Sequence, residues 1–226
     1  MSSTKILVGI DGTGPMSDAT YDKEMETSFV NRLAWKAGDN YGYWRGPIVT
    51  GGGLERAVNQ AFHFIEQKVH STRGVTNVLL TGYSRGATGI VVLANRLQVS
   101  EITVRAMLLF DCVDMHASLD AATIPQNVKN VLHLTRHPDS GSRSSWGNDA
   151  LWYYPDHTKM ERWSYLCTHG ALGGVPSSPS GDETAGDLVK ESATVGKTNV
   201  TYADDARISA VIWADIQSFC LQHGFI

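Results

Sequence analysis

Hydrophobic positions along the chain fall into short apolar runs that alternate with stretches of helical periodicity. The short runs are typical of buried strands and cover residues 5–10, 78–80, 102–110, 128–134 and 163–167. Apolar residues recur at helical spacing over residues 54–69, 90–97 and 208–219. This alternation indicates a mostly parallel sheet covered on both faces. The pattern therefore predicts an α/β fold of the doubly wound type, with functional residues at the carboxyl ends of its strands.

Two long segments are predicted to be rich in loops. Residues 16–53 hold several tryptophans, tyrosines and glycines, and we expect irregular chain that forms a pocket wall at one end of the sheet. Residues 136–200 are also loop-rich, and the Ser, Pro, Gly and acidic stretch at 176–186 is expected to be mobile. Asp204 or Asp205 is expected to cap the final helix. The length of 226 residues predicts one domain, residues 1–226.

One stretch joins a predicted strand to a predicted helix through a serine. The sequence Gly82-Tyr83-Ser84-Arg85-Gly86 fits the pattern Gly-x-Ser-x-Gly. In this motif a sharp turn holds the serine in strained backbone, while small neighbours let other chain segments pass close by. The apolar run before it and the helical pattern after it supply the required context. We therefore interpret Ser84 as a nucleophile rather than as a helix-capping serine.

Composition narrows the classes of partner and cofactor. The formal net charge is -4 and Lys and Arg do not cluster, which argues against nucleic acid as a partner. There is no apolar run near the roughly 20 residues of a transmembrane helix and no signal-peptide core. We expect a protein that is cytoplasmic as synthesised, with any secretion following a signal-less route. Three widely spaced cysteines, Cys112, Cys167 and Cys220, indicate neither disulfides nor zinc, and we expect no metal and no cofactor.

A serine nucleophile requires a histidine to take its proton. In α/β-hydrolases the chain order is serine, acid, histidine, with the histidine on a loop after the last strand. His169 follows the last predicted strand and is the expected base. His137, which follows the preceding strand, is the alternative, while His133 lies within that strand and is expected to be a packed or hydrogen-bonded core residue.

The acid that orients the histidine should stand at the end of a strand after the elbow helix. Asp111 directly follows the predicted strand 102–110, so its carboxylate is the expected acceptor of the imidazole N–H. Asp114, three residues later, and Asp139, after the next strand, are the alternatives. Any of these carboxylates could instead cap a loop.

Acyl transfer also requires N–H donors that face the developing oxyanion. The backbone N–H of Arg85, directly after the nucleophile, is the expected first donor. The second is expected from the loop Asp11-Gly12-Thr13-Gly14, through Gly12 or Thr13, because glycine lets backbone approach a substrate closely. The same glycines could simply shape a turn.

Several segments of the chain carry a shared set of motifs. They are Ile10-Asp11-Gly12-Thr13, Gly51-Gly52-Gly53, Gly82-Tyr83-Ser84-Arg85-Gly86-Ala87, Phe110-Asp111-Cys112-Val113 and His169-Gly170-Ala171-Leu172-Gly173-Gly174. Together they resemble a family of bacterial and fungal α/β-hydrolases that includes the phospholipase effectors of type VI secretion systems. The resemblance implies an α/β-hydrolase fold in which Ser84 is the nucleophile, Asp111 the acid and His169 the base. The chain lacks the large additional regions that many of these effectors use for membrane contact, and it lacks their usual acidic residue soon after the histidine.

The sequence as a whole predicts a serine ester hydrolase of the carboxylesterase or lipase class. Its substrate would be a small-molecule ester or a lipid, with peripheral membrane contact in the lipid case, and its oligomeric state is not indicated. One alternative is a catalytically silent binding module with a hydrolase fold. Another is an ATP- or phosphate-binding enzyme that uses the Asp11-Gly12-Thr13 loop. Aromatic residues could line an acyl site or belong to the core, namely Tyr41, Tyr43, Trp44, Trp152 and Tyr153.

Overall fold

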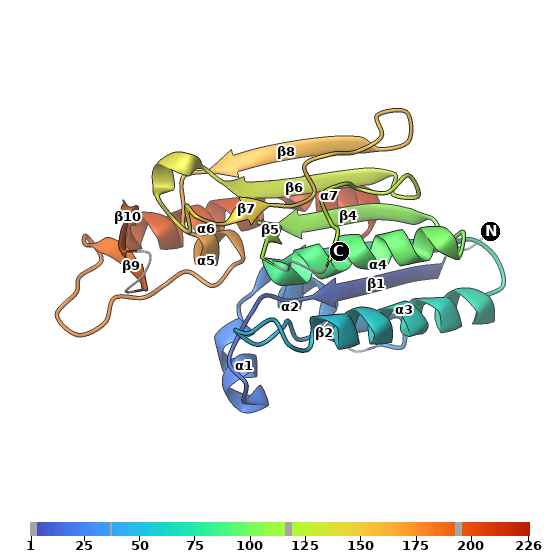
Figure 1. Ribbon diagram of the computed structural model, residues 1–226, viewed down its shortest axis with the longest axis horizontal. Helices are drawn as coiled ribbons and strands as arrows, with labels where there is room; N and C mark the ends of the chain where they lie inside the picture. Colours follow the sequence, from blue (N-terminus) through green and yellow to red (C-terminus); the bar gives the residue numbers. More distant parts are fainter. Residues whose placement is uncertain (1–3, 37, 116–118, 193–195) are drawn as a thin grey trace.

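A six-stranded parallel sheet forms the centre of the computed structural model, which describes residues 4–36, 38–115, 119–192 and 196–226 (Figure 1). The strand order is β2-β1-β3-β4-β6-β8, and each neighbouring pair is parallel. The strands are β1 (Thr4–Ile10), β2 (Tyr41–Trp44), β3 (Thr76–Tyr83), β4 (Val104–Phe110), β6 (Asn130–Arg136) and β8 (Lys159–Tyr165). The predicted fold, a doubly wound sheet of α/β-hydrolase-like type, is confirmed.

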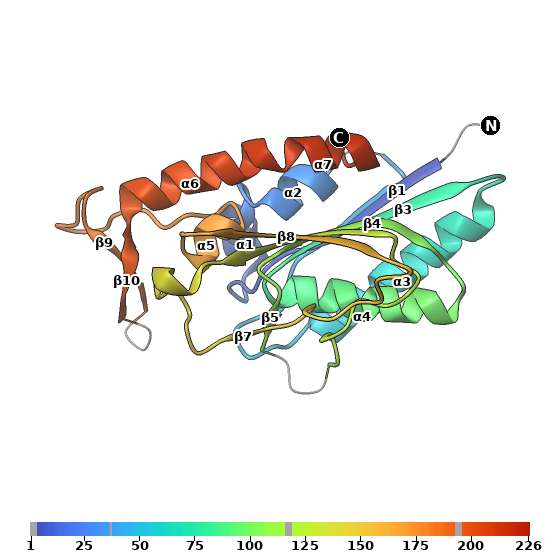
Figure 2. The same cartoon turned by 90° about the horizontal axis from the view of Figure 1, so that it is seen from above.

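Helices cover both faces of this sheet (Figure 2). One face packs against α3 (Leu54–Ser71) and α4 (Arg85–Val99), and the other against α2 (Phe29–Ala34), α6 (Tyr202–Asp215) and α7 (Gln217–His223). Successive side chains of a strand point to opposite faces. In β4, Met107 and Leu109 therefore join the core under α3 and α4, whereas Leu108 and Phe110 join the opposite core. Burial on both faces explains why the central strands are apolar almost throughout.

The carboxyl ends of the strands point to one side of the molecule. That side also holds the short helix α5 (His169–Leu172) and the hairpin of β9 (Leu188–Ser192) and β10 (Gly196–Thr201) (Figure 1). A second antiparallel pair, β5 (Val113–Asp114) with β7 (Gly147–Asn148), follows β4 there. The topology thus gathers the loops after β1, β3, β4, β6 and β8 at one edge, as expected for a doubly wound sheet.

The segment 16–53 is more regular than its sequence predicts. It contains α1 (Asp18–Met25) and α2, capped by Ser17 and Ser28, and the edge strand β2, which pairs with β1. The helices have 8 and 6 residues and the strand only four, one of them a glycine. Elements this short do not complete enough periods to show a hydrophobic pattern. The expectation of irregular chain over 16–53 is therefore wrong.

Several boundaries in the second half also differ from prediction, among them those of β4, which begins at Val104, and of β6, which spans Asn130–Arg136. Strand β8 begins at Lys159, before the predicted run at 163–167, because it is an edge strand and polar residues occupy its outer positions. Residues 136–200 hold this strand, the 3-10 helix Pro138–Ser140, β7, α5, β9 and part of β10, and the longest described stretches outside these elements are residues 173–187 and 149–158. The final helix begins after Thr201, whose hydroxyl accepts from the N–H of Asp204 at 3.1 Å. Thr201 is thus the cap, in place of Asp204 or Asp205.

Glycines of the elbow motif allow the turn to pack directly on the end of β1. A Cβ atom added to Gly86 would lie 2.1 Å from the carbonyl oxygen of Asp11 and 2.4 Å from that of Ile10. A Cβ atom added to Gly82 would lie 2.7 Å from the Cα atom of Ala87. Backbone atoms cannot yield as a flexible side chain can. The close packing of β1 against the elbow therefore requires glycine at these positions.

Replacing Gly86 by alanine should destabilise the protein. The added methyl group forces the elbow away from β1, and overpacking of this kind costs about 2 to 3 kcal/mol. Urea denaturation followed by tryptophan fluorescence measures the change in the free energy of unfolding. Gly186→Ala is the matched control, because its Cβ atom would meet only Thr184 Oγ1 at 3.8 Å. Equal stability of Gly86→Ala and Gly186→Ala would contradict the packing argument.

Candidate active site

Ser84 stands at the sharp turn between β3 and α4. Its backbone has φ 58° and ψ -132°, a left-handed conformation that residues other than glycine rarely adopt. The Ser84 N–H donates to the carbonyl oxygen of Phe110 at 2.9 Å, which ties the turn to the end of β4. The side chain is nearly buried, and its exposed part faces a pocket. The elbow therefore holds one hydroxyl at the floor of a cavity.

Three predicted residues from distant parts of the chain meet at this hydroxyl. His169 lies at the start of α5, and its Nε2 atom is 2.9 Å from Ser84 Oγ. The Nδ1 atom of the same ring is 2.6 Å from Oδ2 of Asp111, which follows β4. All three side chains are buried. A continuous hydrogen-bonded chain thus connects hydroxyl, imidazole and carboxylate, the geometry required when a base activates a serine.

The alternative acids and bases lie elsewhere. His137 caps the 3-10 helix by accepting from the N–H of Asp139 at 3.2 Å, and both side chains are largely exposed. Asp114 is an exposed residue of β5. His133 is fully buried in β6, and burial lowers its pKa to about 4. Among the described residues, none of these four makes a hydrogen bond to Ser84 or its two partners.

Tyr83 and Trp146 hold the imidazole of His169 in place. The Tyr83 hydroxyl donates to the carbonyl oxygen of His169 at 3.0 Å, and the two rings pack with centroids 4.9 Å apart. Trp146 packs edge-on against the other side, 5.1 Å away. A Cβ atom on Gly12 or Gly173 would lie within 2.5 Å of the Tyr83 ring. The variable position before Ser84 in the motif thus carries a residue, Tyr83, that positions the His169 ring.

Arg136, at the end of β6, is a further residue that sequence reasoning missed. Its Nη1 atom is 2.5 Å from the Asp111 oxygen that contacts His169, and both side chains of this ion pair are buried. The other guanidinium nitrogens donate to the carbonyl oxygens of residues 142, 143 and 146. Burial acts to raise the pKa of Asp111, but His169 and Arg136 outweigh it and lower this pKa to about 2. The sequence did carry a signal for Arg136, namely a charged residue at the end of an apolar run.

The expected oxyanion donors differ in their availability. The N–H of Gly12 donates to Oδ1 of Asp11 at 2.8 Å and is therefore occupied, which removes Gly12 from the prediction. Among the described residues, the N–H groups of Thr13 and Arg85 have no hydrogen-bond partner. Both residues line the same pocket as Ser84. The structure thus leaves one amide on each of the two predicted segments free to meet an anionic oxygen.

Asp11 organises the loop that carries Thr13. Its buried carboxylate accepts hydrogen bonds from the hydroxyls of Ser28 and Tyr43 and from the Gly12 N–H. The Tyr21 hydroxyl donates to the carbonyl oxygen of Gly12 at 2.8 Å. Burial raises the pKa of Asp11 to about 6 against these opposing hydrogen bonds. With its oxygens occupied inside the protein, this carboxylate shapes the loop and does not face a ligand.

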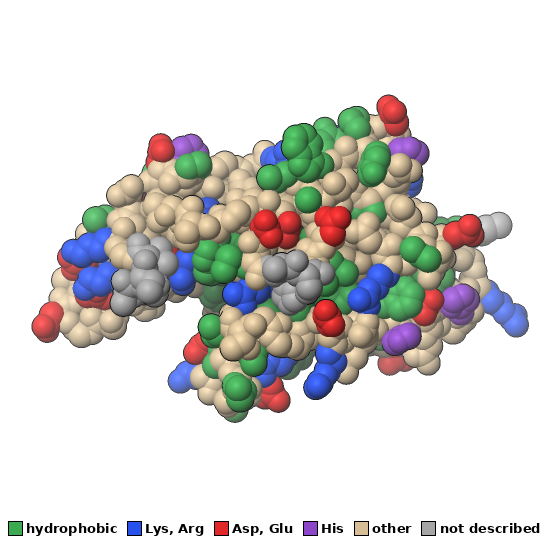
Figure 3. All heavy atoms as spheres, viewed as in Figure 1, with side chains coloured by type: hydrophobic (Ala, Val, Ile, Leu, Met, Phe, Trp, Pro, Cys, Tyr) green, Lys and Arg blue, Asp and Glu red, His purple; other side chains and the backbone are tan. Residues whose placement is uncertain are grey.

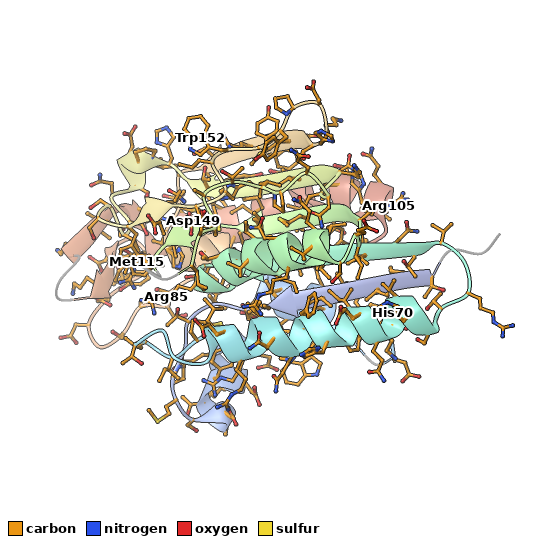
Figure 4. All side chains as sticks on the ribbon, turned by 45° about the vertical axis from the view of Figure 1, so that its right-hand side comes forward. His70, Arg85, Arg105, Met115, Asp149 and Trp152 are labelled. Carbon is orange, nitrogen blue, oxygen red and sulfur yellow. The ribbon has the colours of Figure 1, made fainter. Side chains whose placement is uncertain are left out.

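The pocket above Ser84 has a volume of about 410 Å³. Its wall combines apolar and charged side chains, namely Met25, Val49, Trp146, Val175, Arg85, Arg143 and Glu191. The aromatic residues considered as an acyl site do not line it. Tyr43 hydrogen-bonds to Asp11, while Trp152 is 69% exposed and lies at the outer edge of the molecule (Figure 4). The apolar part of the wall therefore comes from other residues, including Met25, Val49 and Val175.

The described residues include neither a helix that could span a membrane nor a cluster of metal-binding side chains. None of the helices combines the length and the apolar character that crossing a bilayer requires. His, Cys, Asp and Glu side chains do not gather there in a group of three that could hold a metal ion. All three cysteines are buried and unpaired thiols.

Comparison with known proteins gives similarity in structure only. No protein-family model and no curated protein matches the sequence. An uncharacterized protein from Pseudomonas aeruginosa aligns with 76% of this chain and 42% of its own, at 15% identity and a TM-score of 0.46. A protein provisionally named a cell surface hydrolase from Lactobacillus plantarum aligns with 98% of this chain and 93% of its own, at 8% identity and a TM-score of 0.47. A protein provisionally named a YdeN-like hydrolase from Pectobacterium atrosepticum aligns with 74% of this chain and 80% of its own, at 14% identity and a TM-score of 0.38.

This chain thus spans less than half the length of the Pseudomonas protein. Similarity at these levels carries no information about chemistry. The order of the six strands and the elbow after β3 are what define the fold here. The resemblance to type VI secretion effectors stays a prediction.

Replacing Arg136 by methionine should destabilise the protein strongly. The variant leaves the buried Asp111 charge without its arginine partner, and breaking such a pair costs about 3 to 5 kcal/mol. Urea denaturation measures the loss. The same substitution in an Asp111→Asn background should cost clearly less, because no buried carboxylate charge is then left behind. An equal cost in both backgrounds would show that Arg136 acts through the loop alone.

Asp11 should make stability depend on pH between about 4 and 6. The folded protein binds a proton at Asp11 near pH 6, whereas the unfolded chain does so only near the ordinary value of 3.8. Falling pH therefore favours the folded state in this window, by roughly 3 kcal/mol for a shift of two units. Asp11→Asn lacks this contribution. The wild-type protein should gain stability relative to the variant as the pH falls from about 6 to about 4, and a constant difference in unfolding free energy would refute the assignment.

Proposed function

We propose that the protein is a serine ester hydrolase that cleaves carboxylic esters through an acyl-enzyme. The single observation that supports this most is the hydrogen-bonded chain from Ser84 through His169 to Asp111, which ends at the floor of a pocket. The strained backbone of Ser84 adds to it, because strain of this kind is retained where it serves a function.

Each group has one role in the proposed reaction. Ser84 Oγ attacks the ester carbonyl carbon while its proton passes to His169 Nε2. Asp111 accepts the Nδ1–H and stabilises the imidazolium that forms. The carbonyl oxygen becomes an oxyanion, which the N–H groups of Arg85 and Thr13 stabilise. The N–H of Arg85 is suited to this role because the first N–H groups of a helix have no partner within the helix.

Collapse of this intermediate breaks the bond between the carbonyl carbon and the alcohol oxygen. The proton on His169 Nε2 passes to the departing alkoxide, and the acyl group stays on Ser84. A water molecule then loses a proton to His169 and attacks the acyl carbon. The second intermediate releases the carboxylic acid, and Ser84 regains its proton from His169.

The two alternatives receive less support from the site. A phosphate- or ATP-binding function of the kind considered would need the Asp11 carboxylate to face a ligand, but Ser28, Tyr43 and Gly12 occupy this carboxylate. A silent binding module has no use for the matched distances of 2.9 Å and 2.6 Å on the two sides of one imidazole ring. No observation favours either alternative over ester hydrolysis.

Ser84→Ala should abolish ester hydrolysis while the fold stays intact. We expect kcat/KM for 4-nitrophenyl butyrate to fall by about four orders of magnitude or more, since a triad without its nucleophile retains little activity. A fluorophosphonate should label the wild-type protein at Ser84 and leave the variant unlabelled. Ser71→Ala, at an exposed hydroxyl on the end of α3, is the matched control.

These measurements distinguish a serine hydrolase from a binding module that has the same fold. Wild-type turnover by Ser84→Ala would reject the mechanism. Phosphonate labelling at Ser84 without turnover of esters of any chain length would identify a binding module that keeps a reactive serine. Unfolding curves for both variants show that any lost activity is not lost folding.

A further inference from the structure

Two arginines lie on the wall of the pocket that contains Ser84. Arg85 comes from the first turn of α4, and Arg143 comes from the loop between the 3-10 helix and β7. Glu191 of β9 is the one carboxylate on this wall among the described residues. The Asp111 charge behind His169 is already matched by Arg136. The wall thus carries two positive charges and one negative charge, and the excess is positive.

The charge of Arg85 has no acidic partner within ion-pair distance in the described part of the chain. Its Nη1 atom donates to the carbonyl oxygen of Val49 at 2.8 Å, and Ile48 O lies at 3.5 Å. A guanidinium has five N–H donors, so this contact orients the group and leaves other donors open. Burial lowers the pKa of Arg85, which reports that its charge is partly desolvated without compensation.

Arg143 has a strained backbone and a guanidinium whose hydrogen-bonding capacity is not fully used. Its backbone has φ 46°, a conformation that costs energy in a residue with a side chain. Its guanidinium stacks on the Trp146 ring at 4.7 Å and forms an ion pair with Glu191, in which Nε lies 3.6 Å from Oε2, too far for a hydrogen bond. That buried Nε has no hydrogen-bond partner among the described residues. Glu191 instead accepts from the Ser142 hydroxyl at 2.6 Å and the Arg143 N–H at 3.0 Å.

The positive excess on the pocket wall contrasts with the acidic balance of the whole chain. The chain has a net charge of -4. On the face seen in Figure 3, acidic and basic side chains are interspersed with apolar ones, and no broad basic area is present. A general attraction for polyanions would need such an area. A local pair of guanidinium groups beside a nucleophile instead suits one small anionic group.

We propose that the pocket takes an ester that carries an anionic group, a carboxylate or a phosphate, bound by Arg85 and Arg143. This inference rests on the proposed ester hydrolysis at Ser84. Guanidinium groups pair with both oxyanions through parallel N–H donors, and such bonds are stronger in a partly desolvated site. Met25, Val49 and Val175 line the remaining wall and contact the hydrocarbon part of the substrate.

Matched esters with and without a charge test the proposal. On the acyl side, the mono-4-nitrophenyl ester of adipic acid is compared with 4-nitrophenyl hexanoate. On the alcohol side, the hexanoate esters of 4-hydroxybenzoate and of 4-hydroxyphenyl phosphate are compared with that of 4-hydroxybenzamide. The arms show which side carries the anion and whether it is carboxylate or phosphate. In at least one arm the wild-type kcat/KM should favour the anionic ester by about 10-fold or more.

Arginine variants locate the effect. Arg85→Gln and Arg143→Gln should each lower the ratio of kcat/KM for the anionic ester to kcat/KM for its neutral partner, mainly through a higher KM for the anionic ester. The neutral ester, measured with the same variant, is the reference for any change in the rest of the site. Arg85→Lys and Arg143→Lys should restore part of the preference, because they keep the charge. Arg105→Gln is the matched control, since Arg105 lies at the start of β4, at the opposite end of the sheet from Arg85 (Figure 4). Added NaCl at about 0.5 M should weaken the preference.

The results distinguish failure of this inference from failure of the proposed function. Hydrolysis of charged and neutral esters at equal rates in every arm would overturn the anion site and leave the hydrolase intact. A preference that survives in both glutamine variants would place anion binding elsewhere and would also overturn it. Absence of both ester turnover and phosphonate labelling in the wild-type protein would remove the hydrolase function and the anion site with it.

Discussion

The rest of the site depends on the contacts of the buried Asp111 carboxylate with its partners. One of its oxygens meets both His169 and Arg136, and Asn148 donates to the other at 3.3 Å. A charge in this position is stable only while it keeps these partners. The ends of β4 and β6, the start of α5 and the loop at 142–148 are therefore held in one arrangement. The orientation of the imidazole follows from that arrangement and not from its own helix, which has four residues.

The position of Ser84 depends on a second constraint, the absence of side chains where β1 meets the elbow. Gly86 lets the turn rest on the carbonyl oxygens of Ile10 and Asp11, and this contact brings the Thr13 segment beside Ser84. The Asp11 carboxylate then fixes the conformation of that segment through three donors. Preorganised N–H groups stabilise an oxyanion because they need no rearrangement during the reaction. The close packing at Gly86 and the buried Asp11 carboxylate thus both hold the Thr13 segment in place beside Ser84.

The wall of the pocket is coupled to the imidazole segment. The His169 N–H donates to the Ser142 hydroxyl, which donates to Glu191, and Glu191 accepts from the N–H of Arg143. Arg136 joins the same loop to Asp111 through backbone carbonyl oxygens. A change in the loop at 142–146 therefore affects the pocket wall and the orientation of the base together. Under the proposed function, substrate selection and catalysis therefore share one polar network.

The sequence by itself determined the sheet, because strands buried on both faces must be apolar and the helices between them must be amphipathic. It also determined the elbow, since only glycines fit the close contacts around Ser84, and the strand-end positions of Asp111 and His169 follow from the chain order. Tertiary structure alone decided the roles of Arg136, Tyr83 and Arg143, the cap at Thr201, the loss of Gly12 as a donor, and the short elements in 16–53. These features depend on contacts between residues far apart in the chain, or on elements of about two hydrophobic periods, which are too short to show a clear pattern. The charge of Arg136 at the end of an apolar run is the one local signal among them.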